Sequence, residues 1–160
     1  MVTWSEACKG NNININDEKI ANIIQPENLT VRYIRSNESF TEGIINIKIT
    51  VEFTNTSYDQ VSLGIGFEEN LNCNNNVYYF SNSYIYCSAY PSVTKDYTSV
   101  HIQTPPKIQS GEEFNITLDL DKKWLTFAIN DNIIYDGEFN SNGKPAYLVC
   151  GMFVGKLTID

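Results

Sequence analysis

The sequence has little of the chemistry that catalytic and nucleic-acid-binding sites use. Its 160 residues include a single histidine, His101, and only two arginines, Arg32 and Arg35. Nineteen acidic residues against eleven lysines and arginines give a formal net charge of −8. Because nucleic acids and anionic membrane surfaces are bound by clustered basic side chains, this balance argues against both as partners.

Long apolar runs and paired cysteines are also missing. No stretch approaches the ~18 apolar residues that a membrane-spanning helix needs, and the first eight residues lack the basic and apolar regions of a secretory signal. We therefore expect no membrane segment and a cytoplasmic location, where thiols stay reduced. The four cysteines show no C-x-x-C spacing, so we expect free thiols rather than disulfides. They are Cys8, Cys73, Cys87 and Cys150.

No group of side chains has the composition of a catalytic or metal site. A catalytic triad would need His101 beside a nucleophile and a carboxylate, and a zinc site would need more histidines or paired cysteines. Asp119 and Asp121 flank a turn, but calcium takes six to eight oxygen ligands. Glu68 and Glu69 are adjacent, so on a strand they would point to opposite faces. We expect no enzymatic activity, no metal and no cofactor.

What the sequence does contain is the material of one globular core. Hydrophobic residues make up 42% of the chain and aromatic residues 12%, which is typical of a folded domain rather than a disordered one. A chain of this length is expected to form one domain, spanning residues 1–160.

Alternation with a period of two residues is the dominant pattern. From Ile45 to Phe53, apolar and polar residues alternate over nine positions, as on a strand with one buried face. Many such short segments separated by turns predict an all-β fold, a two-sheet antiparallel β-sandwich. Strands are expected at Ile13–Ile15, Leu29–Ile34, Ile45–Phe53, Val61–Phe67, Val77–Phe80, Tyr84–Tyr86, Val100–Ile102, Phe114–Leu120, Leu125–Ile129, Ile133–Tyr135, Ala146–Cys150 and Lys156–Ile159.

Particular residues refine this picture. Asp121-Lys122-Lys123 and Asn130-Asp131-Asn132 read as tight reversals between strands, since Asn and Asp tolerate the left-handed backbone conformation. Gly64 and Gly66 leave one face of their strand bare, so another backbone could approach closely there. The strand context of Trp4 and Trp124 places both in the core. Between residues 17 and 21 we expect at most a short turn.

Several motifs follow one another along the chain: Val31–Ser36, Gly43, Leu63–Gly66, Gly111–Phe114, Leu118–Lys122, Trp124–Asn130 and Pro145–Tyr147. Their order resembles that of the SPRY (B30.2-type) domain family. The likeness covers roughly residues 4–160 and is more specific in the second half. Three features depart from the family pattern: Glu follows Gly111, Asn-Asp replaces Asn-Gly in the hairpin, and the strand after Gly43 is aliphatic. No PRY extension is present.

This resemblance implies a concanavalin-A-like jelly roll of the SPRY type that binds a protein or short peptide without catalysis. Loops at one end of the sandwich would form a shallow pocket for the partner. By position, the resemblance implies a binding site from one tyrosine-bearing loop, a second loop after the Pro145-Ala146 strand, and a third wall between Arg35 and Thr41. The implied contacts are Tyr78, Tyr79, Gly151, Met152, Phe153, Arg35 and Thr41.

A lectin and a hydrolase are two other functions known on this kind of fold. The Gly111–Phe114 motif and the hairpin after Trp124 are also reminiscent of galectins, so a carbohydrate-binding lectin is the alternative. However, the galectin sugar-binding His-x-Asn-x-Arg strand is missing, since His101 is followed by Ile-Gln-Thr. A hydrolase would need an acid–base pair that the sequence does not offer. The sequence is compatible with a chain that acts alone and with one that is a stable component of a larger complex.

Overall fold

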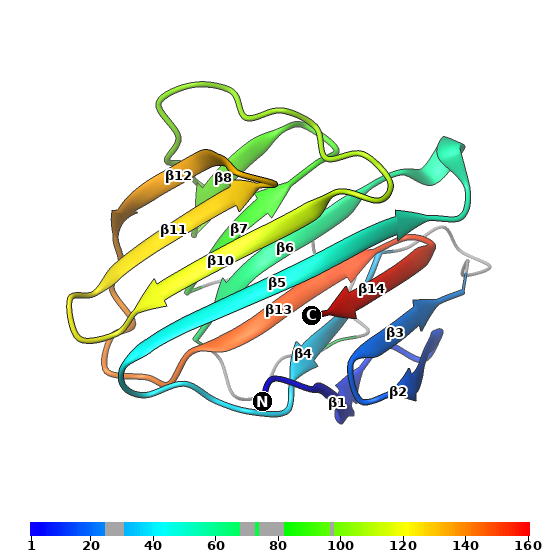
Figure 1. The fold of residues 1–160 in the computed structure, drawn as a ribbon, viewed down its shortest axis with the longest axis horizontal. Helices are drawn as coiled ribbons and strands as arrows, with labels where there is room; N and C mark the ends of the chain where they lie inside the picture. The colour runs from blue at the N-terminus through cyan, green and yellow to red at the C-terminus, as the bar shows by residue number, and fades with distance from the viewer. Residues whose placement is uncertain (25–30, 68–72, 74–81, 97) are drawn as a thin grey trace.

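Fourteen strands build the part of the chain that the structure describes. The structure is a computed structural model and describes all residues except 25–30, 68–72, 74–81 and 97 (Figure 1). The strands are β1 (Trp4–Lys9), β2 (Ile13–Asp17), β3 (Ile20–Ile23), β4 (Arg32–Ser36), β5 (Ile44–Phe53), β6 (Val61–Gly66), β7 (Ser83–Cys87), β8 (Ser92–Lys95), β9 (Thr98–Ser99), β10 (Glu113–Asp119), β11 (Trp124–Ile129), β12 (Asn132–Glu138), β13 (Tyr147–Met152) and β14 (Gly155–Ile159). Within the described ranges the only helical segment is the 3-10 turn η1 (Thr56–Tyr58), so no helix there is long and apolar enough to cross a membrane.

The strands form two antiparallel sheets that pack face to face. Sheet A has the order β1-β4-β13-β6-β7-β8-β9, and sheet B has the order β12-β11-β10-β5-β14-β3-β2. In Figure 1 sheet B lies toward the viewer and sheet A lies behind it. The expected two-sheet antiparallel β-sandwich is thus confirmed.

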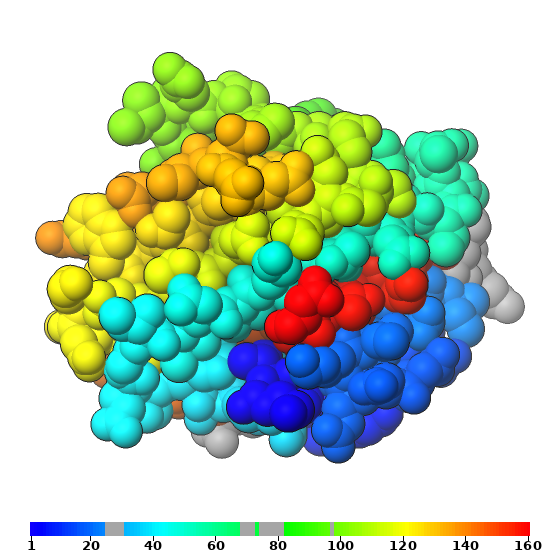
Figure 2. Space-filling model, in the orientation of Figure 1, coloured from blue at the N-terminus to red at the C-terminus, as the bar shows by residue number. Residues whose placement is uncertain are grey.

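In sheet B, the predicted alternation decides which side chains enter the core. Ile47, Ile49 and Val51 of β5 are buried, whereas the polar residues between them face solvent. Strand β10 lies alongside in register, with Ile116 opposite Ile47 and Phe114 opposite Ile49. The opposite, solvent-facing surface of this sheet is the one seen in Figure 2. Sheet B is therefore an ordinary half-buried sheet.

Sheet A is different, because its central strands are buried on both faces. Every residue of β6 and of β13 is buried. The predicted close approach at Gly64 is confirmed: a Cβ at this position would contact the carbonyl oxygen of Tyr84 and lie 2.9 Å from the Cα of Ile85. A Cβ at Gly66 would lie 2.9 Å from a methyl of Val149. The small residues therefore leave room for neighbouring atoms rather than for solvent.

Several predicted elements need correction. The expected strand at Val100–Ile102 is absent: β9 ends at Ser99, and one further bond, from the N–H of Val100 to the carbonyl of Val93 on β8 at 2.9 Å, precedes the crossing to sheet B. That crossing is fixed by the Tyr86 hydroxyl, which donates to the carbonyl of Pro106 at 2.7 Å and accepts from the N–H of Ile108 at 2.9 Å. The alternation in the sequence gave no indication of β1, β3, β8 or β9. The expected strand Val77–Phe80 lies outside the described residues.

The two tryptophans separate into a buried and an exposed one. Trp4 is buried as predicted, and its indole N–H donates to the carbonyl of Lys19 at 2.9 Å. Trp124 is 40% exposed, so the prediction of a core position is wrong for it. It begins β11 opposite Glu138, on the outward face, and its indole N–H donates to Asp136 at 2.6 Å. The turns before and after β11 form as expected, with Lys123 and Asn130 at positive φ.

Candidate functional site

Arg35 and Tyr147 lie together on the outer face of sheet A. Arg35 is on β4 and Tyr147 on the neighbouring β13, and the guanidinium carbon lies 4.0 Å from the centre of the tyrosine ring. Both side chains point away from the core, because the adjacent residues Ile34 and Leu148 belong to the core cluster. Arg35 is half-buried and Tyr147 is buried. This geometry is a cation–π contact that fixes the direction of the guanidinium.

The positions around this pair form a continuous surface, which we call the sheet A outer face. It is made of the residues of β4, β6, β7 and β13 that alternate with the core residues. Most of them are small or buried, so this face has little freely exposed side-chain area. They are Tyr33, Arg35, Ser62, Gly64, Gly66, Ile85, Tyr147, Val149 and Gly151.

Cys73, which lies between β6 and β7 in the sequence, is on this side of the sandwich. The carbonyl of Cys73 accepts the backbone N–H of Tyr33 at 3.1 Å, and its Sγ lies 2.8 Å from Sγ of Cys8 on β1. These residues form a second, smaller apolar cluster separate from the main core. It contains Cys8, Val31, Tyr33, Cys73, Phe153 and Val154.

The predicted contacts Gly151, Met152 and Phe153 do not form an exposed loop. Gly151 and Met152 are the last two residues of β13, and Phe153 lies in the short turn before β14. Met152 packs in the main core, while Phe153 is buried beside Tyr58, with ring centres 6.1 Å apart. Gly151 contacts the ring of Tyr33. The segment therefore supports the sheet A outer face rather than projecting from it.

Thr41 lies at the opposite end of the sandwich from Phe153. Strand β5 is ten residues long and runs from Ile44 to Phe53, so its ends are about 30 Å apart. Thr41 is exposed just before the Ile44 end, whereas the β13–β14 turn lies at the Phe53 end, where Gly155 pairs with Phe53. The prediction that all three segments meet at one end is therefore wrong for this pair.

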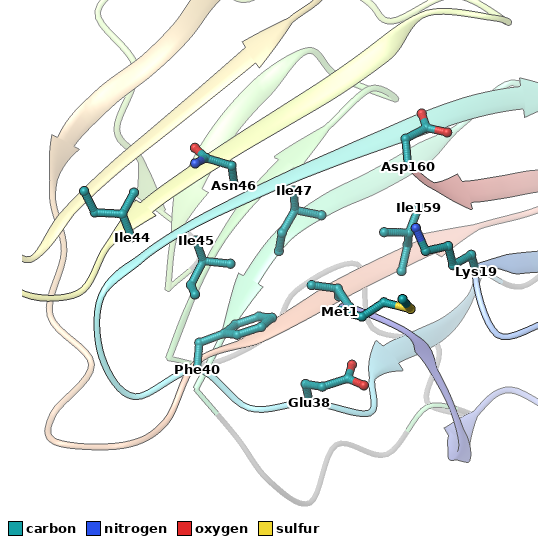
Figure 3. Close-up of a pocket in the computed structure, with 11 residues that line it drawn as sticks. Met1, Lys19, Glu38, Phe40, Ile44, Ile45, Asn46, Ile47, Ile159 and Asp160 are labelled. Carbon is teal, nitrogen blue, oxygen red and sulfur yellow. The ribbon is translucent and has the colours of Figure 1, made fainter.

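The loop that contains Thr41 instead borders a pocket at the Ile44 end. Glu38 and Phe40 of this loop line it together with Met1, parts of β5 and the end of β14 (Figure 3). Its volume is about 490 Å³. A larger cavity of about 610 Å³ lies between residues 100–106 and β12, and it includes His101 and Tyr135. Sequence periodicity gave no signal for either cavity, because both form between segments distant in the sequence.

Tyr78 and Tyr79, the remaining predicted contacts, lie outside the described residues. Of the predicted set, the structure thus places Arg35 and Gly151 on one face. It adds Tyr33 and Tyr147 to them, two residues that the sequence analysis did not single out. The sequence did contain a signal for Tyr147, because this residue directly follows the Pro145-Ala146 motif and begins β13.

The thiols differ in their electrostatic surroundings. The contact with Cys73 lowers the pKa of Cys8, burial opposes this shift, and the positive charge of Arg35 adds to it. The contact with Cys8 raises the pKa of Cys73, and burial adds to that rise. All four cysteines are free thiols in the structure. Within the described residues, no three His, Cys, Asp or Glu side chains gather in a way that could hold a metal ion.

Comparisons with known proteins identify the fold. No family model matches the sequence, and no curated protein matches it. Among solved structures, the SPRY domain of human HERC1 superposes with a TM-score of 0.76 at 12% identity, covering 98% of this chain and 96% of that one. The TRIM65 PSpry domain gives 0.76 at 16% identity, covering 99% and 91%. A human SPRY domain gives 0.66 at 8%, covering 92% and 94%. The chain has the SPRY jelly-roll fold.

Proposed function

We propose that the chain is a non-catalytic protein-interaction module that binds a short peptide or a partner surface at Arg35, the half-buried residue of the otherwise buried sheet A outer face. The observation that carries the proposal is the Arg35–Tyr147 pair. An arginine held over a tyrosine ring gives a directed donor beside an aromatic surface, and Arg and Tyr are enriched among residues that dominate binding energy. Proteins of this fold are typically interaction modules, which supports the same function.

Charge favours Arg35 as the anchor. The chain carries a net charge of −8, and both of its arginines are on β4. A guanidinium on a domain of net negative charge offers a point of contact for a carboxylate or a main-chain carbonyl of the partner. The surrounding acidic surface would favour neutral or basic residues elsewhere in the partner.

We propose Tyr78 and Tyr79 as further contacts, as the family resemblance implies. Tyrosine provides a large contact area and a hydroxyl at low entropic cost. Gly151, Met152 and Phe153 would contribute indirectly, because their packing keeps Tyr33 and β13 in place. Thr41 would belong to a separate surface, since its loop lies at the far end of β5.

The test is affinity capture from the native cell lysate, followed by crosslinking and mass spectrometry. Variants Arg35→Ala and Tyr78→Ala plus Tyr79→Ala are each expected to lose at least about tenfold in recovery of the main partner. Thr117→Ala on the outer face of sheet B is the matched control and should retain it. If both folded site variants capture the same proteins at wild-type level, the proposed site is wrong.

A second candidate function is carbohydrate binding, and the exposed Trp124 favours it. The indole lies on a polar sheet face and is fixed by Asp136, which also accepts from the Thr126 hydroxyl at 2.7 Å. An oriented aromatic face among polar groups suits the mixed apolar and polar surface of a sugar. A glycan array separates the two functions: binding that free sugar competes away and that Trp124→Ala abolishes would establish the lectin.

A further inference from the structure

Two thiols distant in the sequence lie in direct contact. Cys8 and Cys73 are 65 positions apart, and their Sγ atoms are separated by 2.8 Å. Neither belongs to the main core; both lie in the second apolar cluster with Tyr33 and Phe153. The contact joins β1, at one edge of sheet A, to the long connection between β6 and β7.

An irregularity in β1 brings the two cysteines together. Trp4 pairs with Ser36 and Lys9 pairs with Ile34, so five steps along β1 correspond to two along β4. Such a bulge redirects side chains and leaves backbone groups of the partner strand unpaired. Next to the bulge, Tyr33 of β4 bonds both segments. Its N–H donates to the carbonyl of Cys73 at 3.1 Å, and its carbonyl accepts from the N–H of Gly10, two residues after Cys8, at 2.8 Å. Both cysteines are thus held beside the same residue of β4.

The surroundings distinguish the two sulfurs. Cys8 retains 9% of its surface exposed and Cys73 5%, so Cys8 is the more accessible of the pair. The contact with Cys73 and the charge of Arg35 both favour the Cys8 thiolate, and burial opposes it. Since the thiolate is the reactive form, the pair has the arrangement of an attacking thiol beside a resolving thiol.

We propose that Cys8 and Cys73 form an oxidation site that reacts with a hydroperoxide and closes to an intramolecular disulfide. The inference goes beyond the proposed function, because it requires no binding partner. Its consequence is a covalent link between β1 and the connection that reaches the sheet A outer face at Tyr33.

The chemistry balances with one molecule of hydrogen peroxide. The Cys8 thiolate attacks one peroxide oxygen, the O–O bond breaks, and hydroxide leaves as Cys8 becomes a sulfenic acid. The Cys73 sulfur then attacks Sγ of Cys8, the S–O bond breaks, and the released hydroxide takes the Cys73 proton. The two thiols lose two electrons and two protons in total, and the peroxide is reduced to two molecules of water.

The experiment treats the reduced, folded chain with hydrogen peroxide and maps the cysteines by mass spectrometry after alkylation. In the wild type we expect a linked Cys8–Cys73 peptide pair, two hydrogens lighter than the reduced peptides and restored by dithiothreitol. We expect Cys8 to react at least about ten times faster than Cys150, whose thiol is fully buried and has a raised pKa.

Two variants complete the test. In Cys73→Ser the reaction should stop at the Cys8 sulfenic acid, which dimedone traps. Cys87→Ser is the matched control, because Cys87 is the partly exposed thiol, and it should still form the Cys8–Cys73 link. Free, alkylatable Cys8 and Cys73 in peroxide-treated wild type that stays folded by circular dichroism would overturn the proposal, and so would a link from either one to Cys87. The wild-type result decides even if a variant does not fold.

Discussion

The outer faces of the two sheets differ in the polarity and in the burial of their side chains. On sheet B the outward side chains are polar and exposed, as in the Lys48–Glu113 ion pair at 3.1 Å and the Thr117–Asn46 hydrogen bond at 3.0 Å. On sheet A the outward positions of β6 and β13 are buried and include three glycines. The outer face of sheet B is exposed to water, whereas the outer face of sheet A is closely packed. Substitutions matched between the faces should therefore differ strongly in cost.

The largest difference is expected for alanine at the two strand glycines. A Cβ at Gly64 would contact the carbonyl oxygen of Tyr84 and come within 2.9 Å of the Cα of Ile85, both backbone atoms of a central strand pair. We expect Gly64→Ala to lower the free energy of unfolding by about 4 kcal/mol or more, because the sheet must shift to admit it. Urea denaturation followed by circular dichroism measures this change.

Gly137→Ala is the matched control on sheet B. Gly137 is on the edge strand β12, and a Cβ there would lie 3.0 Å from the hydroxyl at the tip of the Tyr135 side chain. A side-chain tip can move, so we expect a change within about 0.5 kcal/mol. Equal effects of the two substitutions would show that the sheets are packed alike and would break the comparison.

The next prediction compares two isoleucines. Ile85 is on the sheet A outer face and 2% exposed, and Ile44 is on the sheet B outer face and 59% exposed. Ile85→Ala should cost about 3 kcal/mol, the usual penalty for removing a buried aliphatic side chain, and Ile44→Ala less than about 0.5 kcal/mol. Both changes in the free energy of unfolding are obtained from the shift of the urea midpoint, provided that the dependence of this free energy on urea concentration stays the same. A cost below about 1 kcal/mol at Ile85 would mean that the sheet A outer face is open in solution.

Strand length and regularity explain which parts of the fold could be predicted. The sheet B strands β5 and β10 alternate over their whole length, and their bounds were predicted to within one residue. Strand β6 of sheet A was predicted equally well although it is buried on both faces, because Gly64 and Gly66 keep the alternation. β1 carries a bulge, and β3 and β8 are only four residues long, and all three escaped detection. Alternation therefore predicts long, regular strands and fails for short or irregular ones.

The candidate site was harder to predict than the fold for a related reason. Arg35 was selected by its motif, but its contact with Tyr147 depends on the register of β4 against β13, which pattern does not reveal. The loop positions were misplaced because the turn after Met152 is only two residues long and tucks into the apolar cluster. The Cys8–Cys73 contact joins residues with no local spacing, so no short motif could have indicated it.

A smaller effect is expected for polar pairs on the two faces. A double-mutant cycle of Arg35→Ala and Tyr147→Ala should give a coupling free energy of about 1 kcal/mol, because the cation–π contact is largely removed from water. The cycle of Lys48→Ala and Glu113→Ala should give at most about 0.5 kcal/mol, since both side chains are exposed. Raising the salt concentration should weaken only the second. A larger coupling at Lys48–Glu113 would reverse the ranking of the two faces.

The smallest expected effect concerns Glu38, in the loop that carries the chain from sheet A to sheet B. Burial raises the pKa of Glu38, but the hydrogen bonds from the Thr3 N–H and hydroxyl, both 2.7 Å long, lower it below its usual value. A lowered pKa means that the carboxylate stabilises the fold above the unfolded-state pKa of about 4.3, and that this contribution disappears as the pH falls through the folded-state value. Glu38→Gln should therefore cost a few tenths of a kcal/mol at pH 7 and nothing once the pH lies below the folded-state pKa. Urea midpoints across this range measure it, with Glu42→Gln in the same loop as a control for loss of charge. A cost that stays constant with pH would show that Glu38 acts through packing, and that the link between the two sheets does not depend on its charge.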